Sequence, residues 1–248
     1  MPLLSIITVT YNAGRFLERT IQSIGKPTGE VEYIIVDGGS KDNTLNLVRQ
    51  YEDHVTKWVS EPDRGLYDAM NKGLKLAQGD YVWFMNAGDE IHDATVLPRL
   101  KERLTSNADV YYSDALFVRD DGSPVGLRSE ITPHTLPKQL AWQDMALGMK
   151  VCHQAFIVRR TIAPTYLVDN LSADLDWEIN SLKAAHTAEY LDFVLCKYLI
   201  GGLSVQQHRR SLTDRFKVLV HHFGWVATVK NHWQISLRAL RFKLSANN

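Results

Sequence analysis

Trp83-Phe84-Met85-Asn86-Ala87-Gly88-Asp89-Glu90 is the stretch of this 248-residue chain that best indicates its fold. The apolar run from Tyr81 to Met85 predicts a buried strand, which stops at a small polar turn holding a carboxylate. In open α/β sheets, ligands bind outside the carboxyl ends of the strands. We therefore expect Asp89 to bind a metal ion or organise phosphate. The alternative is an aspartate that caps the following helix.

The same succession of apolar strand and polar turn occurs three times before this stretch. We predict strands at 3–10, 31–36 and 55–59, ending in polar turns at Tyr11, Asp37 and Asp63. Apolar residues at helical spacing follow each turn, within 16–24, 45–51 and 66–77. This alternation predicts an α/β fold with a parallel sheet and right-handed crossovers.

The alternation is less regular after Asp89. We predict helices at 96–104 and within 171–182, a helical segment at 141–149, and strands at 109–118, 125–128, 152–158 and 191–198. Asp120-Asp121-Gly122-Ser123 reads as a hairpin turn between the first two of these strands.

Composition excludes several classes of protein. The net charge is zero, so the overall field does not favour nucleic acid. Cys152 and Cys196 give neither a disulfide framework nor zinc spacing, which favours a reduced, cytoplasmic compartment. The apolar segment 3–9 lacks a basic flank and a cleavage site, so we expect a first strand and not a signal peptide. No stretch approaches the roughly 20 apolar residues of a membrane span.

The C-terminal region differs in charge from the rest. From His208 onward, eight Lys and Arg residues face one acid, Asp214. Apolar residues recur there at helical spacing between Phe216 and Leu244, and Gly224 is a candidate break. Two interpretations are open: a helical cover packed on the sheet, or a basic helix pair on an anionic membrane surface.

Familiar nucleotide-binding and acyl-transfer motifs are absent from the sequence. There is no P-loop, and the first strand is not followed by G-x-G-x-x-G; Gly38-Gly39 follows the second strand. No serine elbow or convincing Cys–His spacing is present. What remains is carboxylates at strand ends and a later acidic cluster, Asp174-Leu175-Asp176-Trp177-Glu178.

The motifs together resemble the family 2 glycosyltransferases with the GT-A fold. The resemblance is carried by Ser5–Asn12, Tyr33–Thr44 (Tyr-Ile-Ile-Val-Asp-Gly-Gly-Ser-Lys-Asp-Asn-Thr), Ser60–Gly73 (Ser-Glu-Pro-Asp-Arg-Gly-Leu-Tyr-Asp-Ala-Met-Asn-Lys-Gly) and Phe84–Asp89. Looser matches at His153-Gln154-Ala155, Ser172-Ala173-Asp174 and Gly201-Gly202-Leu203-Ser204 resemble the exopolysaccharide members, including the WcaE-like colanic-acid transferases. The resemblance implies residues 1–108 as a nucleotide-sugar half, 109–205 as an acceptor half, and 206–248 as a basic amphipathic tail.

A nucleotide-sugar donor, with UDP favoured, is the first implication of this resemblance. Tyr11 can stack on the base, Thr8 and Asn12 can hydrogen-bond nearby, and Asp37 can accept from base or ribose. The alternatives are a packing aromatic for Tyr11 and a local Asx turn for Asp37. Arg64 can reach base or phosphate or be a solvated cation, and Asp68 either joins the donor site or lies in the first turn of a helix.

A divalent cation, Mg²⁺ or Mn²⁺, is the second implication. Asp89 lies in the region of the family's metal-binding D-x-D motif, but Asn86-Ala87-Gly88-Asp89 keeps only its last carboxylate. A hard cation can be held by one or two protein carboxylates together with diphosphate and water.

The acceptor side is the third implication. Asp174 matches the family's catalytic base, with Asp176 as the alternative; either can instead cap a helix. Trp177 can stack on a sugar or pack internally, and His153 can approach the acceptor or the metal or be a buried histidine beside Cys152. Gly202 and Ser204 can line the acceptor side or form a plain turn.

The resemblance therefore implies an inverting glycosyltransferase of cell-surface polysaccharide synthesis, which we expect to be cytoplasmic or peripheral on the inner face of the membrane. Its acceptor would be a saccharide, free or carried on a polyprenyl lipid. Two rivals stay open. One is a sugar nucleotidyltransferase, for which Tyr11-Asn12-Ala13-Gly14-Arg15 is a short phosphate loop. The other is a non-catalytic saccharide-binding or scaffolding module that has lost its metal motif.

Overall fold

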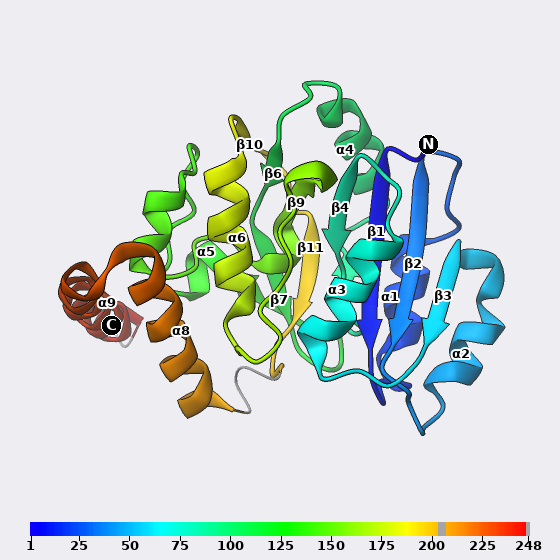
Figure 1. Cartoon of the computed structure of the whole chain (residues 1–248), viewed down its shortest axis with the longest axis horizontal. Helices are drawn as coiled ribbons and strands as arrows, with labels where there is room; N and C mark the ends of the chain where they lie inside the picture. Colours follow the sequence, from blue (N-terminus) through cyan, green and yellow to red (C-terminus); the bar gives the residue numbers. More distant parts are fainter. Residues whose placement is uncertain (203–206, 247–248) are drawn as a thin grey trace.

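The computed structural model describes residues 1–202 and 207–246 as a central sheet flanked by helices (Figure 1). In the first half the elements are β1 (Leu4–Thr10), α1 (Leu17–Ile24), β2 (Val31–Asp37), α2 (Thr44–Gln50), η1 (Glu52–His54), β3 (Lys57–Ser60), α3 (Leu66–Leu76), β4 (Tyr81–Phe84), β5 (Glu90–Ile91) and α4 (Val96–Leu104). In the second half they are β6 (Val110–Tyr112), β7 (Ala115–Val118), β8 (Pro124–Leu127), α5 (Arg128–Ile131), η2 (Trp142–Leu147), η3 (His153–Ala155), β9 (Phe156–Arg159), η4 (Arg160–Ile162), α6 (Ala173–Ala184), β10 (Ala188–Tyr190), β11 (Cys196–Leu199), α8 (His208–Phe223) and α9 (Trp225–Ala246).

The larger sheet has the strand order β10-β6-β9-β4-β1-β2-β3. β1 is parallel to both β2 and β4, and β2 is parallel to β3, so the predicted α/β fold with a mostly parallel sheet is confirmed. β1 and β4 are buried at every position, as expected for central strands covered on both faces. Figure 1 shows α3 in front of β1 and β2 and α1 behind them.

Gly73 explains how closely α3 approaches the sheet. A Cβ atom at this position would lie 2.5 Å from Cγ2 of Ile7 on β1, so a larger residue would push the helix away. Tyr67 and Met70 of the same helix are buried against the sheet. The helix therefore holds the loop before it, residues 61–65, firmly at the carboxyl edge of the strands.

The second half contains a smaller sheet that we did not predict, with the order β5-β11-β7-β8. The single strand predicted at 109–118 is wrong: β6 joins the large sheet and β7 joins the small one. The chain passes from one sheet to the other at Ser113, between β6 and β7. There the N–H of Ser113 donates to the Ala155 carbonyl, and its hydroxyl accepts from the N–H of Leu195. The hairpin between β7 and β8 is confirmed.

Other expected elements of this half are shorter or of a different kind. The strand predicted at 152–158 begins with the 3-10 turn η3 and becomes extended only at Phe156. Of the strand predicted at 191–198, only the end is extended, as β11, and β10 at Ala188–Tyr190 was not expected. The helical segment expected at 141–149 is the 3-10 helix η2.

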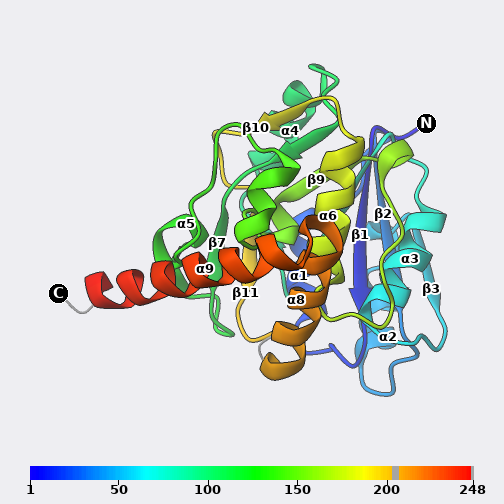
Figure 2. The ribbon, with the colours of Figure 1, turned by 60° about the vertical axis from the view of Figure 1, so that its left-hand side comes forward.

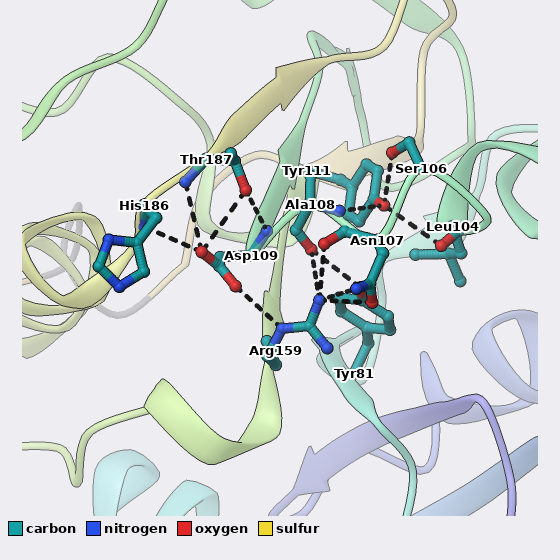
Figure 3. Close-up of polar contacts among 10 residues, drawn as sticks. All are labelled: Tyr81, Leu104, Ser106, Asn107, Ala108, Asp109, Tyr111, Arg159, His186 and Thr187. Atoms are coloured by element: carbon teal, nitrogen blue, oxygen red, sulfur yellow. Dashed lines mark hydrogen bonds and ion pairs between the residues drawn. The ribbon is translucent and has the colours of Figure 1, made fainter.

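β9 runs antiparallel between β4 and β6, and a polar network at its end holds it there (Figure 3). Nε of Arg159 lies 2.9 Å from Oδ1 of Asp109, and its Nη2 donates to the Tyr81 hydroxyl and the Asn107 carbonyl, each at 2.8 Å. Oδ2 of Asp109 accepts the N–H of His186 at 2.8 Å. One ion pair therefore joins the starts of β4 and β6 to the segment before β10.

The C-terminal region is helical, and Gly224, with φ of 79°, separates α8 from α9 as predicted. α8 packs against α6 through Val218 and Leu219, which are buried. Figure 2 shows α9 crossing one side of the molecule, with its C-terminal end projecting beyond the rest.

Candidate active site

One large cavity lies at the carboxyl ends of β1, β2 and β4, the edge toward which the arrowheads of β1 and β2 point in Figure 1. Its volume is about 1410 Å³. Polar residues from both halves of the chain line it: Tyr11, Asn12, Asp63, Asn86, Asp89, Arg128, His153, Gln154 and Asp174. This is the position where open α/β sheets bind ligands.

The turn after β1 presents an aromatic ring to this cavity. Tyr11 is 62% exposed and lines the cavity wall. Asn12 adopts a left-handed conformation, with φ of 48°, and its side-chain oxygen accepts the N–H of Lys41 at 2.8 Å. Thr8 lies away from the cavity, because its buried hydroxyl donates to the Met85 carbonyl at 2.6 Å. Tyr11 and Asn12 are therefore brought to the cavity, and Thr8 is not.

The turn after β2 uses Asp37 internally. This carboxylate is fully buried and accepts the N–H groups of Gly39 and Ser40, each at 3.0 Å, and the hydroxyls of Ser40 and Ser60. The local Asx-turn interpretation fits these contacts, because they leave little capacity for a ligand.

Asp63 is the carboxylate that faces the cavity at this edge. A Cβ atom at Gly38 would lie 2.3 Å from Oδ2 of Asp63, so the glycine makes room for that side chain. Asp63 Oδ1 accepts the N–H of Gly65 at 2.8 Å. We did not single Asp63 out as a donor-site residue, although its place after β3 repeats the pattern of Asp37 and Asp89.

Arg64 and Asp68 pair with each other outside the cavity lining. Nη2 of Arg64 lies 3.0 Å from Oδ1 of Asp68, and the Arg64 side chain is 73% exposed. The backbone N–H of Arg64 also donates to Asp68, at 3.1 Å. Asp68 therefore accepts hydrogen bonds from Arg64 at the beginning of α3. For either side chain to contact a sugar-nucleotide donor, this exposed pair would have to move.

Asp89 sits at the centre of the cavity wall and is 4% exposed. Its Oδ1 accepts the N–H of Leu199 at 2.8 Å. Burial raises the pKa of this carboxyl to about 7, although the Leu199 hydrogen bond opposes the shift. Gly88, with φ of 108°, lets Leu199 approach, because a Cβ there would lie 2.8 Å from the leucine side chain.

The environment of Asp89 suits a hard cation. Asn86 lines the same cavity, and its buried Oδ1 has no hydrogen-bond partner in the described part of the chain. One carboxylate and one amide oxygen are ligands that Mg²⁺ or Mn²⁺ accepts when a diphosphate and water complete the shell. Residues 1–202 and 207–246 contain no group of three or more His, Cys, Asp or Glu side chains that could hold a metal alone. A cation here would therefore depend on the ligand it accompanies.

The opposite wall of the cavity carries Asp174, in the first turn of α6. Burial raises the pKa of its carboxyl, while nearby His153 and the N–H of Leu175, at 2.9 Å, oppose that shift. A buried carboxylate with a raised pKa is suited to accept a proton near neutral pH.

His153 and Glu178 lie beside Asp174. The His153 Nε2 is 3.0 Å from the Tyr166 hydroxyl, and its Nδ1 is 3.7 Å from Oε1 of Glu178. Burial lowers the pKa of His153 to about 4 and, together with the charge of Asp174, raises that of Glu178 well above its usual value. We expect Glu178 to be protonated, so that it does not add charge beside Asp174. Its position one helical turn after Asp174 could have drawn attention to it.

Two other expected acceptor residues point elsewhere. Asp176 lies outside the cavity lining, because its Oδ1 is 2.7 Å from Nε2 of His222 on α8. Trp177 is fully buried and stacks on Tyr166 at 5.1 Å between ring centroids, so it has no face for a sugar. Gly202 lines the cavity, and Ser204 lies outside the described residues.

Arg128 is the cavity-lining cation that we did not expect from the sequence. It is 8% exposed and donates to the carbonyls of Lys150, at 2.6 Å, and Met149, at 2.7 Å. Nothing in the spacing of the sequence distinguishes it from an exposed residue at the end of a hairpin strand. Its burial depends on Met149 and Lys150, which lie about twenty residues further along the chain, and no sequence pattern shows that they return to Arg128.

Comparison with known proteins identifies similar chains. The model of the family described as Glycosyl transferase family 2 matches residues 5–166. A PGL/p-HBAD biosynthesis glycosyltransferase of Mycobacterium bovis (strain BCG / Pasteur 1173P2) is 30% identical over 215 residues, which are 82% of this chain and 79% of that protein. The putative teichuronic acid biosynthesis glycosyltransferase TuaG of Bacillus subtilis (strain 168) is 26% identical over 213 residues, 84% of this chain and 83% of TuaG.

Solved structures agree with this fold. The 1–349 fragment of S. aureus TarS in complex with UDP-GlcNAc superposes with a TM-score of 0.71 at 20% identity, covering 88% of this chain. The chain spans 64% of that TarS fragment. The mannosyltransferase PcManGT of Pyrobaculum calidifontis, solved with GDP-Man and Mn²⁺, has a TM-score of 0.65 at 16% identity, covering 99% of this chain and 75% of PcManGT. At these identities the likeness shows the fold alone.

Proposed function

The chain belongs to glycosyl transferase family 2, and we propose that it transfers one sugar, with inversion, from a nucleoside-diphosphate sugar to a saccharide or polyprenyl-linked saccharide in cell-surface polysaccharide synthesis. UDP is the favoured nucleotide of the donor. The observation that carries the proposal is the single cavity in which Asp89 and Asp174 face the same space from opposite halves of the chain. Within the family, a likeness to the colanic-acid transferases stays a prediction.

The nucleotide half of the cavity has the chemistry that a donor requires. Tyr11 offers an exposed ring to a base, and Asp63 offers a carboxylate to a base or ribose hydroxyl. Asp89 and Asn86 would hold a divalent cation, Mn²⁺ or Mg²⁺, which when bound offsets negative charge on a departing diphosphate.

The acceptor half supplies the base. Asp174 would take the proton of the acceptor hydroxyl while that oxygen attacks the anomeric carbon, with the sugar–phosphate bond breaking on the opposite side. Its partly buried position raises its pKa, which strengthens it as a base. His153, neutral and held by Tyr166, gives the carboxylate a polar neighbour without competing for that proton.

The C-terminal region supports an acceptor at a membrane. None of the described helices is long and apolar enough to cross a bilayer. α9 nevertheless exposes Trp225, Val226, Val229, Trp233, Leu237, Leu240 and Leu244. These residues follow the helical period, and Lys230 and Arg241 accompany them. We propose that this face, hereafter the α9 apolar face, lies on an anionic membrane surface of the cytoplasm.

Product analysis tests the proposed reaction. The purified chain is incubated with UDP-, GDP- and dTDP-sugars, with and without Mn²⁺, and with saccharide or polyprenyl-linked acceptors. We expect release of one nucleoside diphosphate and a glycosylated acceptor of inverted configuration. Release of pyrophosphate would instead indicate a sugar nucleotidyltransferase. Binding of saccharide with no turnover of any donor would indicate a non-catalytic module.

A further inference from the structure

Four cationic side chains gather between the cavity and the C-terminal helices without carboxylate partners. They are Arg128 at the start of α5, Lys150 after η2, Arg215 of α8 and Arg238 of α9, hereafter the cation cluster. None of the four forms an ion pair in the described part of the chain, whereas Arg159 of β9 pairs with Asp109 and Arg103 of α4 pairs with Glu189.

Contacts with backbone and with His134 bring the cluster together. Arg128 donates to the Lys150 carbonyl at 2.6 Å, which ties the two residues to each other. Nη2 of Arg238 donates to the Leu147 carbonyl at 3.0 Å and lies 3.2 Å from Nδ1 of His134. Lys150 is 7% exposed, and its ammonium group forms no hydrogen bond with the residues that the structure describes. These residues are therefore held in place by groups that do not neutralise them.

The mutual influence of these groups supports the same picture. Burial, followed by the charges of Arg128, Arg238, Lys150 and Arg215, lowers the pKa of His134 to about 3. Burial and the charge of Arg238 also lower the pKa of Lys150. Neighbouring carboxylates reduce the repulsion only in part: Asp144 favours the charge of Lys150, and Asp174 that of Arg215.

A concentration of partly buried cations is unfavourable for the unliganded protein, because each side chain is desolvated and repels the others. Such an arrangement becomes favourable when an anion of two or more charges binds among them. Arg128, one of the four cations, lines the same cavity as Asp174. An anion bound here would thus lie on the acceptor side.

The helix that supplies Arg238 also limits the kind of anion. Leu237 and Trp233 of α9 are exposed, 37% and 70% respectively, on the same helix that turns Arg238 inward. α9 packs against η2, which ends shortly before Lys150, and Figure 2 shows the helix crossing this side of the molecule. A ligand with a phosphate head and an apolar tail satisfies both features, because its head can reach the cations while its tail follows the apolar face.

We propose that the cation cluster binds the phosphate groups of a phosphorylated carrier lipid that presents the acceptor sugar to Asp174. The inference rests on the proposed transferase function and names the class of acceptor for the same site. The donor's diphosphate is the other possible source of phosphate, and it would sit beside Asp89 and Asn86, in the nucleotide half.

Thermal unfolding and calorimetry of the full chain test the cluster with farnesyl diphosphate as the probe, below its micelle concentration. Farnesol and inorganic pyrophosphate are the comparison ligands, each tested alone and with saturating UDP and Mn²⁺. We expect farnesyl diphosphate to bind equally well with and without UDP, and at least about tenfold more tightly than either comparison ligand. Displacement by UDP, equal binding of pyrophosphate or of farnesol, or no binding would each overturn the proposal.

Variants locate the binding. Lys150→Gln should weaken farnesyl diphosphate binding at least about tenfold, leave stabilisation by UDP unchanged, and raise the melting temperature of the unliganded protein by relieving repulsion. Lys138→Gln is the matched control, because Lys138 is exposed on the neighbouring loop outside the cluster, and it should change none of these quantities. Equal loss of binding in both variants would refute the proposal. If UDP fails to bind the wild type, the donor site fails separately, and the farnesyl diphosphate result stands by itself.

Discussion

Asp89 shows how a functional carboxylate opposes stability. Its pKa in the folded protein is about 7, above its ordinary value of about 3.9 in an unfolded chain. The folded protein therefore holds this proton more tightly than the unfolded chain does. The stabilising contribution is fully present below about pH 4 and is lost as the pH rises through about 7. Charging Asp89 without a cation is the unfavourable step.

The first prediction follows from the direction of this pKa shift. Asp89→Asn should raise the free energy of unfolding at pH 8 by up to about 4 kcal/mol, with little change at pH 4. The same variant should lose donor turnover, because the cation loses its charged ligand. Urea unfolding at both pH values, in chelator, measures the first effect, and nucleoside diphosphate release measures the second. A variant less stable than wild type at pH 8 would contradict the assignment.

Asp174 carries the second prediction. Asp174→Asn should lower the transfer rate about 10²- to 10⁴-fold, the usual contribution of a general base, while the dissociation constant for UDP stays unchanged. Because burial raises the pKa of Asp174, the wild-type rate should fall as pH decreases through a midpoint above that of an ordinary aspartate. Rates from pH 5 to 9 and calorimetric titration with UDP provide the measurements.

Asp176→Asn is the matched control for this base, since it lies two residues away but contacts His222 instead of the cavity. We expect it to keep a transfer rate within a few-fold of wild type. If Asp176→Asn were inactive and Asp174→Asn active, the two carboxylates would have to exchange roles.

The limits of sequence analysis at this scale are visible in three carboxylates. Asp89 follows a strand and Asp174 lies at the start of a helix, and both line the cavity. Strand ends and helix starts are local features, so the sequence displays them. Asp37 shows the same local features, yet its oxygens accept backbone N–H groups of its own turn. The difference lies in Gly38, which leaves the space that Asp63 fills from a separate segment. Such a relation between two loops is not expressed in the spacing of either one.

At the scale of elements, the junction of α6 and α8 determines how the C-terminal region joins the rest. The His222 side chain is 1% exposed, with Nε2 2.7 Å from Asp176 and Nδ1 2.8 Å from Nζ of Lys183. Asp214 of α8 accepts the N–H of Leu171, just before α6, at 3.1 Å. α8 is therefore part of the packed structure, although its sequence belongs to the basic tail.

The third prediction tests that junction. His222→Ala should lower the free energy of unfolding by about 2–4 kcal/mol, because it removes the partner of Oδ1 of the buried Asp176 and leaves only Asn180, which donates to Oδ2. His221→Ala, at the exposed neighbouring position, should change it by no more than about 0.5 kcal/mol. Denaturant unfolding of the two variants gives the comparison. Equal effects would mean that α8 does not depend on this contact.

The elements of the two halves differ in how readily a sequence predicts them. β1 to β4 alternate with helices, and β1, β2 and β4 are buried runs, so the local pattern is sufficient. In the second half, β5 has two residues, and β6 and β7 are separated only by Ser113 and Asp114. The mostly apolar segment 109–118 looks like one strand, and only tertiary pairing with β9 and β11 divides it. For these reasons the small sheet could not be predicted from the local sequence pattern.

At the scale of the whole molecule, charge and apolar surface are separated along the chain. The large sheet has its ion pairs internally balanced, as at Arg159 and Asp109. α9 instead exposes two tryptophans and several aliphatic residues beside Lys230 and Arg241, which form no ion pair within residues 1–202 and 207–246. A soluble protein rarely exposes such a continuous apolar face without a partner. The projection of α9 away from the sheet in Figure 2 leaves that face free to meet a flat surface.

The last prediction concerns this surface. Trp233, 70% exposed in the α9 apolar face, would insert at the boundary between headgroups and acyl chains, where tryptophan is favoured. Trp233→Glu should therefore reduce sedimentation with vesicles containing anionic phospholipid at least about tenfold, because it removes apolar area and adds repulsion. Leu167→Glu, at an exposed leucine outside α9, is the control and should bind as wild type does. Wild-type binding should weaken as salt rises from 50 to 500 mM and be lower on zwitterionic vesicles, since Lys230 and Arg241 act through charge. If both variants bind vesicles equally, or if lipid charge has no effect on binding, the membrane is removed from the proposed function and the α9 apolar face serves another partner. The proposed transfer reaction at Asp174 does not depend on this result.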